Sequence, residues 1–474
     1  MEGLRTFNPF QNSENNSLFI PDTPRDVKKR LDYIGYQFAE NPPLSKKKIE
    51  SFFDVTIQKL QVSKGQLFTI YSAESALSKE RYDAEFDRLI FQLKHFSSFV
   101  KTSPNTESVE EGNLGGFIVP YIKKTYPIGP ILVMGSSNFP LAYSTLGGDT
   151  VSAFAAQCPV IVKAHPFHLG TSSFVASIVE EVIEEVGLPD WFFTHIIDYK
   201  DHRNTDLIVQ HPALKGIGFT GSQRIGKLIL EKARERVNDP IPVFAEMGSI
   251  NPVVLGEKLS IDSIEGISKK MVTAVNTDAG QFCTKPGVIF LPNTNAGQKF
   301  LSSFHESWKK EPHYFMLHPT IEMNYQERIK KWRINYPNNA LASIEGSKIN
   351  HGQKISFCFS AIQVMKENIE FEEVFGPCTF FVLYDQMEEV YSILKRMDGQ
   401  LTGSFFGKVF DEKLLQIFEK MCGRVIHNDV PTGVNVLKSM NHGGPFPASS
   451  DVRFTAVGMD SVKRFQKAVT LQNF

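Results

Sequence analysis

Between residues 24 and about 100, apolar side chains recur at three- and four-residue spacing, which is the pattern of amphipathic helices. Each of three such stretches follows a residue that can cap a helix. They are "TPRDVKKRLDYIGYQFAEN", "SKKKIESFFDVTIQKLQV" and "KERYDAEFDRLIFQLKHFSSFVK". The polar stretch "TSPNTESVEEGNLGG" then interrupts the pattern, and "FIVPYIKKTYPIG" predicts extended strands with proline among them. We therefore expect a helical lead-in followed by a connection or an edge hairpin.

From residue 130 onward, short apolar runs alternate with helical stretches. The first runs are "PILVMG", "PVIVKAH", "FTHIIDY", "KGIGFTG", "PVFAEMG" and "PVVLG". Apolar runs that lack polar alternation and are separated by helices predict a parallel sheet covered on both faces. A second set runs through "VIFLP", "SFCFSAIQV", "CTFFVLY", "GSFFGKVF" and "RVIHND". The pattern predicts an α/β protein with room for a separate catalytic domain facing the first.

Composition limits the class of protein. The chain has 474 residues, 42% hydrophobic and 22% charged, which is typical of a soluble globular protein with two or three domains. Its 51 basic and 52 acidic residues leave a net charge of -1, so no overall charge favours nucleic acid or an anionic membrane. The first residues lack the basic start and apolar run of a secretory signal, and no run reaches transmembrane length. We expect a cytoplasmic enzyme.

Chemistry is expected in the loops after the strands, because ligands bind beyond the carboxyl ends of parallel strands. In "GFTGSQRIG" the G-x-G-x-x-G fingerprint is absent, yet Ser222 can cap a helix whose N-terminus faces an anion. A plain strand-to-helix turn explains the same residues. Lys163 ends the strand "PVIVK", where it can meet a ribose or phosphate or simply extend its ammonium into solvent.

Two further side chains follow apolar strands. Glu246 lies between "PVFA" and "MGS", where partial burial would raise its pKa toward the range of a general base. A surface acid that caps the next segment is the alternative. Asn138 in "GSSNFP" can donate its side-chain N–H to an oxyanion, or only to its own turn.

Cys283 in "GQFCTKPG" has small and polar neighbours, and Lys285 supplies a nearby cation that would favour the thiolate. A buried, inert thiol is the alternative, and it is the interpretation for Cys158, Cys358, Cys378 and Cys422. No histidine lies within 25 residues upstream or 20 downstream, so sequence gives no local base for the thiol, although one can approach in space.

No metal centre is expected. The five cysteines are scattered without a C-x-x-C pair, which argues against disulfides and against a thiolate zinc site. His165 and His168 in "HPFH" could pair on a metal, but a proline separates them and no matching ligands accompany them.

Taken in order, six motifs resemble those of the aldehyde dehydrogenase superfamily. They are "SSNFP", "VIVKAHP", "GFTGS", "AEMGSINP", "GQFCTKPG" and "EEVFGP", and they span residues 130 to 377. The resemblance implies an α/β fold of the aldehyde dehydrogenase type, with a Rossmann-type cofactor domain, an α/β catalytic domain and a small β oligomerisation arm. The implied boundaries are residues 1–112 and 128–247 for the cofactor domain, 113–127 and 455–474 for the arm, and 248–454 for the catalytic domain.

The same resemblance implies a role for each matching residue. Cys283 is the nucleophile, Glu246 the general base and Asn138 the oxyanion donor. The implied cofactor contacts are Lys163, Arg203, Phe219, Gly221, Ser222, Gly248, Glu373 and Phe375. A short carboxylate substrate would need a basic group, for which Lys285, Arg424 and Arg453 are candidates.

Details of the motifs and of the tail are similar to an NADP-type branch that contains 2,5-dioxovalerate (α-ketoglutarate semialdehyde) dehydrogenases and a bacterial fatty aldehyde dehydrogenase. Pro166 stands where NAD-preferring relatives often carry an acid, so NADP is favoured and NAD is possible. The implied reaction oxidises an aldehyde to an acid, in a homodimer or homotetramer. Fatty or aromatic aldehydes are alternative substrates, and a non-redox cysteine hydrolase or acyltransferase is an alternative class.

Overall fold

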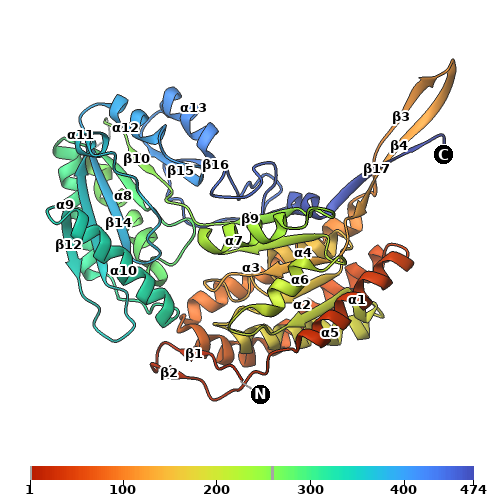
Figure 1. Ribbon diagram of the computed structural model, residues 1–474. Helices are drawn as coiled ribbons and strands as arrows, with labels where there is room; N and C mark the ends of the chain where they lie inside the picture. Colours follow the sequence, from red (N-terminus) through yellow and green to blue (C-terminus); the bar gives the residue numbers. More distant parts are fainter. Residues whose placement is uncertain (1–2, 258–260) are drawn as a thin grey trace.

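The first lobe is built on a five-stranded parallel sheet in the order β7-β6-β5-β8-β9, in a computed structural model that describes residues 3–257 and 261–474 (Figure 1). The strands are β5 (Ile131–Met134), β6 (Val160–Lys163), β7 (Phe193–Ile196), β8 (Gly216–Thr220) and β9 (Val243–Glu246). Because side chains alternate along a strand, Ile131 and Val133 enter one core while Leu132 and Met134 enter another. The predicted parallel sheet, buried on both faces, is confirmed.

Helices cover both faces of this sheet. The three predicted N-terminal helices are confirmed as α1 (Pro24–Glu40), α2 (Lys46–Ser75) and α3 (Lys79–Thr102). The others are α4 (Gly148–Ala155), α5 (Leu169–Glu185), α6 (Arg203–Gln210) and α7 (Gln223–Arg234), with the short turn η1 (Asp190–Phe192). The core formed with α2, α3, α4 and α5 lies on one face, and the core formed with α1, α6 and α7 lies on the other. A short hairpin, β1 (Phe7–Asn8) and β2 (Ser13–Glu14), precedes them.

The second lobe holds a seven-stranded sheet in the order β12-β13-β14-β11-β10-β15-β16. Only its edge strand β12 runs antiparallel to its neighbour. The strands are β10 (Val253–Leu255), β11 (Val288–Pro292), β12 (Ala340–Ile344), β13 (Lys354–Ser360), β14 (Cys378–Tyr384), β15 (Gln400–Phe406) and β16 (Cys422–His427). The helices are α8 (Ile261–Asn276), α9 (Asn295–Lys310), α10 (Pro319–Asn335), α11 (Ala361–Lys366), α12 (Met387–Leu394) and α13 (Glu412–Met421). The turn η2 (Thr277–Gly280) follows α8 directly.

A three-stranded antiparallel arm projects from the first lobe (Figure 1). Its strands are β3 (Thr106–Leu114), β4 (Phe117–Pro127) and β17 (Gln466–Gln472), the last following η3 (Met459–Phe465). Strand β3 begins at Thr106, inside the polar stretch that the sequence presented as a break and ahead of the predicted start at residue 113. Its side chains are exposed or half-buried throughout, so no alternation of apolar residues marks it as a strand.

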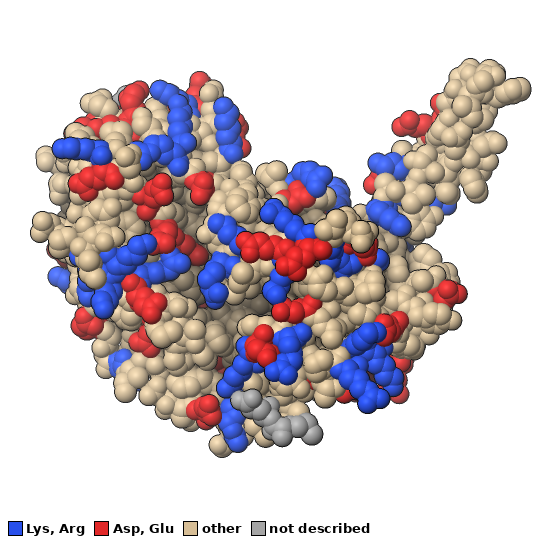
Figure 2. Space-filling view, in the orientation of Figure 1, with Lys and Arg blue, Asp and Glu red and all other residues tan. Residues whose placement is uncertain are grey.

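Acidic and basic side chains are interspersed over the face shown in Figure 2. This mixture agrees with the near-zero net charge. Within the described ranges, no helix combines the length and the apolar character needed to cross a lipid bilayer.

Candidate active site

The carboxyl edge of the five-stranded sheet carries three of the predicted site residues. Lys163 ends β6, Glu246 ends β9, and Asn138 lies in the loop after β5. Glu246 is only 4% exposed, although a carboxylate is normally solvated. Its backbone carbonyl accepts a hydrogen bond from the Gly221 N–H at 3.0 Å, so the turn after β8 lies beside it. The predicted gathering of these loops at one edge is therefore present.

A tight left-handed turn delivers Cys283 to this edge. Asp278, Ala279 and Gly280 have φ values of 50°, 55° and 64° in succession. A Cβ on Gly280 would lie 2.5 Å from the Gly376 carbonyl oxygen, so the close approach requires glycine there as well as the positive φ. The chain consequently turns sharply after α8. Cys283 then lies half-buried in the loop between η2 and β11.

Two asparagine side chains hold the cysteine loop. Asn251 donates its Nδ2 hydrogens to the carbonyls of Cys283 at 2.8 Å and Lys285 at 3.0 Å. Asn138 donates to the Gln281 carbonyl at 2.9 Å. The structure therefore brings Asn138 to the loop that bears the thiol. Sequence reasoning missed Asn251, whose signal was its place in "AEMGSINP", five residues after Glu246.

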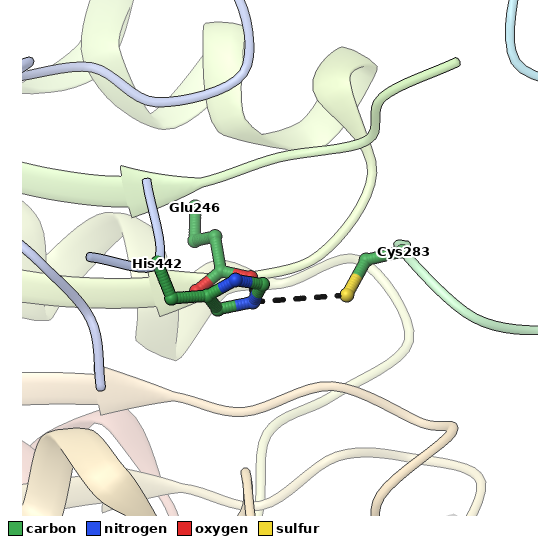
Figure 3. Close-up of side chains that lie close together, drawn as sticks. All are labelled: Glu246, Cys283 and His442. Atoms are coloured by element: carbon green, nitrogen blue, oxygen red, sulfur yellow. Dashed lines mark hydrogen bonds and ion pairs between the residues drawn. The ribbon is translucent and has the colours of Figure 1, made fainter. Parts of the chain in front are cut away.

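His442 is the functional residue that the sequence gave no means of locating. Its Nε2 atom lies 3.9 Å from Cys283 Sγ and 2.6 Å from Glu246 Oε1 (Figure 3). Its side chain is 1% exposed. The three side chains come from β9, from the loop before β11 and from the loop after β16, and they point toward one another. A cysteine, a histidine and a carboxylate in contact can move a proton away from the thiol.

The loop that carries His442 is fastened to β9. The Ser450 N–H donates to the Ala245 carbonyl at 2.9 Å, and the Met247 N–H donates to the Ala448 carbonyl at 2.8 Å. The His442 N–H itself donates to Thr455 Oγ1 at 2.9 Å. These bonds place a segment 159 residues away in the sequence beside Cys283.

Burial and neighbouring carboxylates raise the pKa of Cys283 well above its ordinary value, with Glu246 and Glu373 acting after burial. Lys285 is itself buried, and its ammonium donates to the Cys378 carbonyl at 2.5 Å. Its charge acts on Glu373, whose pKa burial nevertheless raises to about 7. The expectation that Lys285 favours the Cys283 thiolate therefore finds no support in this geometry, and a contact with substrate stays a prediction.

Several predicted cofactor residues follow strands at the carboxyl edge of the sheet. A Cβ on Gly248 would lie 1.9 Å from Glu373 Oε2, so the Glu373 carboxylate rests against the backbone of this glycine. Ser222 caps α7 by accepting the Ile225 N–H at 3.4 Å. Burial lowers the pKa of Lys163.

A half-buried lysine at a strand end, a capped helix N-terminus and a glycine beside a carboxylate fit a nicotinamide dinucleotide, which offers phosphates and ribose hydroxyls.

Other predicted residues lie elsewhere. Phe219 is 5% exposed, and its ring packs beneath Gly221, where an added Cβ would lie 2.6 Å from it. Phe375 is half-buried. Arg203 is exposed and pairs with Asp201 at 2.5 Å. Direct cofactor contacts by these three side chains stay predictions.

Of the three candidate cations for a substrate carboxylate, Arg424 acts electrostatically on Cys283. Its guanidinium donates to the Gly433 carbonyl at 2.8 Å and to the Pro431 carbonyl. Its buried Nε has no partner in the part of the chain that the structure describes. Arg453, by contrast, has a side chain that is 75% exposed and pairs with Asp451 at 2.5 Å.

Comparison with known proteins identifies relatives along nearly the whole chain. A model described as "Aldehyde dehydrogenase family" matches residues 5–450. An α-ketoglutaric semialdehyde dehydrogenase of Acinetobacter baylyi is 30% identical over 473 residues, covering 96% of this chain and 88% of the relative. An α-ketoglutaric semialdehyde dehydrogenase of Azospirillum brasilense is 33% identical over 432 residues, covering 85% of this chain and 78% of the relative.

Solved structures share the fold at lower sequence identity. The glyceraldehyde-3-phosphate dehydrogenase of Methanocaldococcus jannaschii, complexed with NADP, has a TM-score of 0.84 at 16% identity and covers 100% of this chain and 99% of its own. A 1-pyrroline-5-carboxylate dehydrogenase from Thermus with bound NAD has a TM-score of 0.84 at 17% identity and covers 100% of this chain and 90% of its own. The expected α/β architecture is thereby confirmed.

Proposed function

Because this chain belongs to the aldehyde dehydrogenase family and is an oxidoreductase acting on aldehydes, we propose that Cys283 attacks the aldehyde carbon of α-ketoglutaric semialdehyde. The contact of Cys283 with His442, and of His442 with Glu246, carries this proposal. Since the thiol has a raised pKa, it needs a base to accept its proton as the C–S bond forms. His442 Nε2 lies where it can accept that proton, and Glu246 lies where it can stabilise the resulting imidazolium.

Attack produces a thiohemiacetal alkoxide on Cys283, and this negative charge needs hydrogen-bond donors. The Asn138 amide, beside the cysteine loop, and the Cys283 N–H are the proposed donors. Asn138 is held near by its bond to the Gln281 carbonyl. Bound nicotinamide dinucleotide supplies the hydride acceptor, and Lys163, Ser222, Gly248 and Glu373 would hold it.

Loss of hydride leaves a thioester on Cys283, which water must hydrolyse. Glu246 is proposed as the base that takes the proton of the attacking water, either directly or through His442. Its burial keeps bulk water from competing for the same carboxylate. The products are a carboxylic acid and the free thiol, so the enzyme returns to its starting state.

The proposed substrate rests on the two relatives named for α-ketoglutaric semialdehyde and on Arg424. A substrate that carries a carboxylate away from its aldehyde is stabilised by a cation on the approach to the thiol. Arg424 is proposed for this role because its charge acts on Cys283 and its buried Nε has no partner among the described residues. Fatty and aromatic aldehydes offer no such anion. They are the alternative substrates within the same chemistry.

NADP is the proposed preferred cofactor, with NAD also accepted. Pro166 places no carboxylate near Lys163 that would repel a 2′-phosphate. Arg203 is less well placed for this role than the sequence suggested, because Asp201 already neutralises it.

The arm supports assembly into a dimer or tetramer, since Phe117 and Ile118 are 75% and 69% exposed at its tip. We assign the cofactor to the first lobe, which also carries Asn138 and Glu246, and the nucleophile Cys283 to the second lobe. Five free cysteines fit the reducing cytoplasm as its location.

A kinetic panel tests the proposal. Purified enzyme is mixed with α-ketoglutaric semialdehyde, succinic semialdehyde, hexanal or benzaldehyde, each with NADP or NAD, and reduced cofactor is followed by absorbance. We expect the highest kcat/KM for α-ketoglutaric semialdehyde with NADP, and no turnover by Cys283→Ser. Highest activity on hexanal or benzaldehyde would favour the alternative substrates. Cofactor-independent ester hydrolysis without any aldehyde oxidation would favour a cysteine hydrolase.

A further inference from the structure

Glu246, Cys283 and His442 bring three different metal-binding groups to one point. Their candidate ligand atoms, a carboxylate oxygen, Sγ and an imidazole nitrogen, all lie within 4.8 Å of one another. We propose that these side chains form a zinc-binding site, and that a bound Zn²⁺ holds the enzyme in a reversible inactive state. The site shares its three side chains with the proposed oxidation chemistry, which itself needs no metal.

The ligand set suits zinc. Zn²⁺ binds thiolate, imidazole and carboxylate ligands at about 2.0 to 2.3 Å in tetrahedral geometry, which puts ligand atoms about 3.5 Å apart. Here Nε2 of His442 is 2.6 Å from Glu246 Oε1 and 3.9 Å from Cys283 Sγ. The first distance is shorter and the second longer than the tetrahedral value, and all three ligand atoms lie within 4.8 Å of one another, so side-chain movements of about 1 Å would form the site. Three protein ligands leave a fourth position for water.

The buried carboxylate of Glu246 also favours binding of a cation. Glu246 is 4% exposed, yet neither of its carboxylate oxygens accepts a hydrogen bond of good geometry from any described residue, despite the short distance to His442. A buried carboxylate without such partners is costly. A divalent ion would satisfy it and would stabilise the thiolate beside it.

Zinc binding exchanges one thiol proton for the metal ion. Zn²⁺ displaces the proton of the Cys283 thiol, the S–H bond breaks as the S–Zn bond forms, and the proton passes to solvent. No oxidant or reductant is involved. The metal binds the sulfur lone pair that attacks the aldehyde, and it binds the carboxylate that activates water. Aldehyde oxidation and thioester hydrolysis therefore both stop until a chelator removes the ion.

The histidine pair singled out in the sequence does not offer a comparable site. His165 and His168 stack with ring centroids 5.1 Å apart, and His168 Nε2 already contacts the Ser136 carbonyl at 3.1 Å. Among the described residues, only the Glu246 cluster unites three potential ligands. The proposal therefore rests on residues far apart in the sequence.

Cobalt substitution tests binding without cofactor or aldehyde. The full-length, metal-stripped enzyme is titrated with Co²⁺, whose bond to a thiolate gives an ultraviolet charge-transfer band, and Zn²⁺ is then added. We expect one equivalent of Co²⁺ to produce the band and Zn²⁺ to abolish it. Cys283→Ser should lose the band. The matched control Cys358→Ser, at a half-buried position on β13, should keep it.

Two further variants test the remaining ligands. His442→Gln and Glu246→Gln should each weaken Zn²⁺ binding at least about 100-fold in competition with a chromophoric chelator, because each removes a direct ligand. No band in the wild-type enzyme, or a band unchanged in Cys283→Ser, overturns the site. Unchanged affinity in both His442→Gln and Glu246→Gln does so as well.

Protection of the thiol gives a second measurement on the unaltered chain. Zn²⁺ should slow the alkylation of Cys283 by iodoacetamide at least about 10-fold, as read from peptide masses, and excess chelator should restore the rate. Equal alkylation with and without Zn²⁺ contradicts the proposal even if a variant fails to fold. Since neither measurement uses an aldehyde, zinc binding can fail or succeed independently of the proposed oxidation.

Discussion

His442 and Glu246 lie with Nε2 and Oε1 2.6 Å apart, both buried, and the same Nε2 atom lies 3.9 Å from Cys283 Sγ. A carboxylate that neighbours an imidazole fixes its orientation and stabilises its protonated form. A proton that passes from the thiol to Nε2 therefore lies within reach of Glu246 Oε1 on the same nitrogen. We therefore expect His442 to act in proton transfer and not only in packing.

His442→Gln should lower kcat about 100-fold or more, because the thiol loses its proton acceptor. The hydride burst of the first turnover should slow with it, since attack by sulfur precedes hydride loss. Stopped-flow absorbance of reduced cofactor measures both rates. His95→Gln, on α3 outside the site, is the control and should behave as wild type. An undiminished burst in His442→Gln would assign the proton to another group.

Alkylation of Cys283 in the ligand-free enzyme should become faster with pH. Its pKa is raised by burial, Glu246 and Glu373, so the reactive thiolate is scarce at pH 7 and increases about tenfold per pH unit up to pH 9. Glu246→Gln removes one of the raising charges and should speed alkylation at pH 7. Iodoacetamide labelling followed by peptide mass measures the rate. A plateau below pH 8 would show that the thiol is already ionised there.

Glu246→Gln should retain a burst of hydride transfer and then turn over slowly, because the thioester forms but water lacks its base. Rapid-quench trapping should detect acylated Cys283 in the steady state. An unchanged steady-state rate would mean that His442 or another group activates the water without Glu246.

Much of this architecture could be predicted because its signals are local. Unbroken apolar runs between amphipathic helices identified the parallel sheets, and the loops after them contained Asn138, Lys163 and Glu246. Strand β3 escaped prediction since both of its faces meet solvent. Lys285 looked like a partner of Cys283 from sequence distance alone, whereas its ammonium turns inward to the Cys378 carbonyl.

His442 was beyond sequence reasoning for a different reason. Its contact with Cys283 depends on hydrogen bonds between β9 and the segment around Ser450, which no periodicity encodes. Proximity in sequence favoured Lys285, but packing in space brought a histidine from 159 residues away.

Arg424→Met should raise KM for α-ketoglutaric semialdehyde about 10-fold or more and leave KM for hexanal nearly unchanged, because only the first substrate carries a distant carboxylate. Steady-state kinetics on both aldehydes measure the difference. Arg453→Met is the matched control, since Arg453 is exposed and already paired with Asp451. Equal loss on both aldehydes would indicate that Arg424 supports the Gly433 loop instead of binding substrate.

Arg81 of α3 connects the two loops of the site. Its Nε donates to Asp278 Oδ2 at 2.6 Å, just before the cysteine loop, and a terminal nitrogen donates to the Asn138 carbonyl at 3.1 Å. The guanidinium also stacks over Phe139, 4.3 Å from the ring centroid. A helix of the first lobe thus fixes Asn138, the proposed oxyanion donor, relative to the loop that bears Cys283, the proposed nucleophile.

Arg81→Met should lower the free energy of unfolding by about 3 kcal/mol at pH 7, because it leaves Asp278 buried without its cation. Burial already raises the pKa of Asp278, and loss of Arg81 raises it further. A carboxyl whose pKa is raised in the folded state carries a penalty that is complete above that raised pKa and is lost as the pH falls toward the pKa of the unfolded chain, so the deficit should shrink from pH 8 to pH 5. Urea unfolding followed by circular dichroism measures it. Lys79→Met, one half of an exposed pair with Asp83 on the same helix, should change stability little. A deficit that is equal at both pH values would place the cost in lost packing instead of in the unpaired charge.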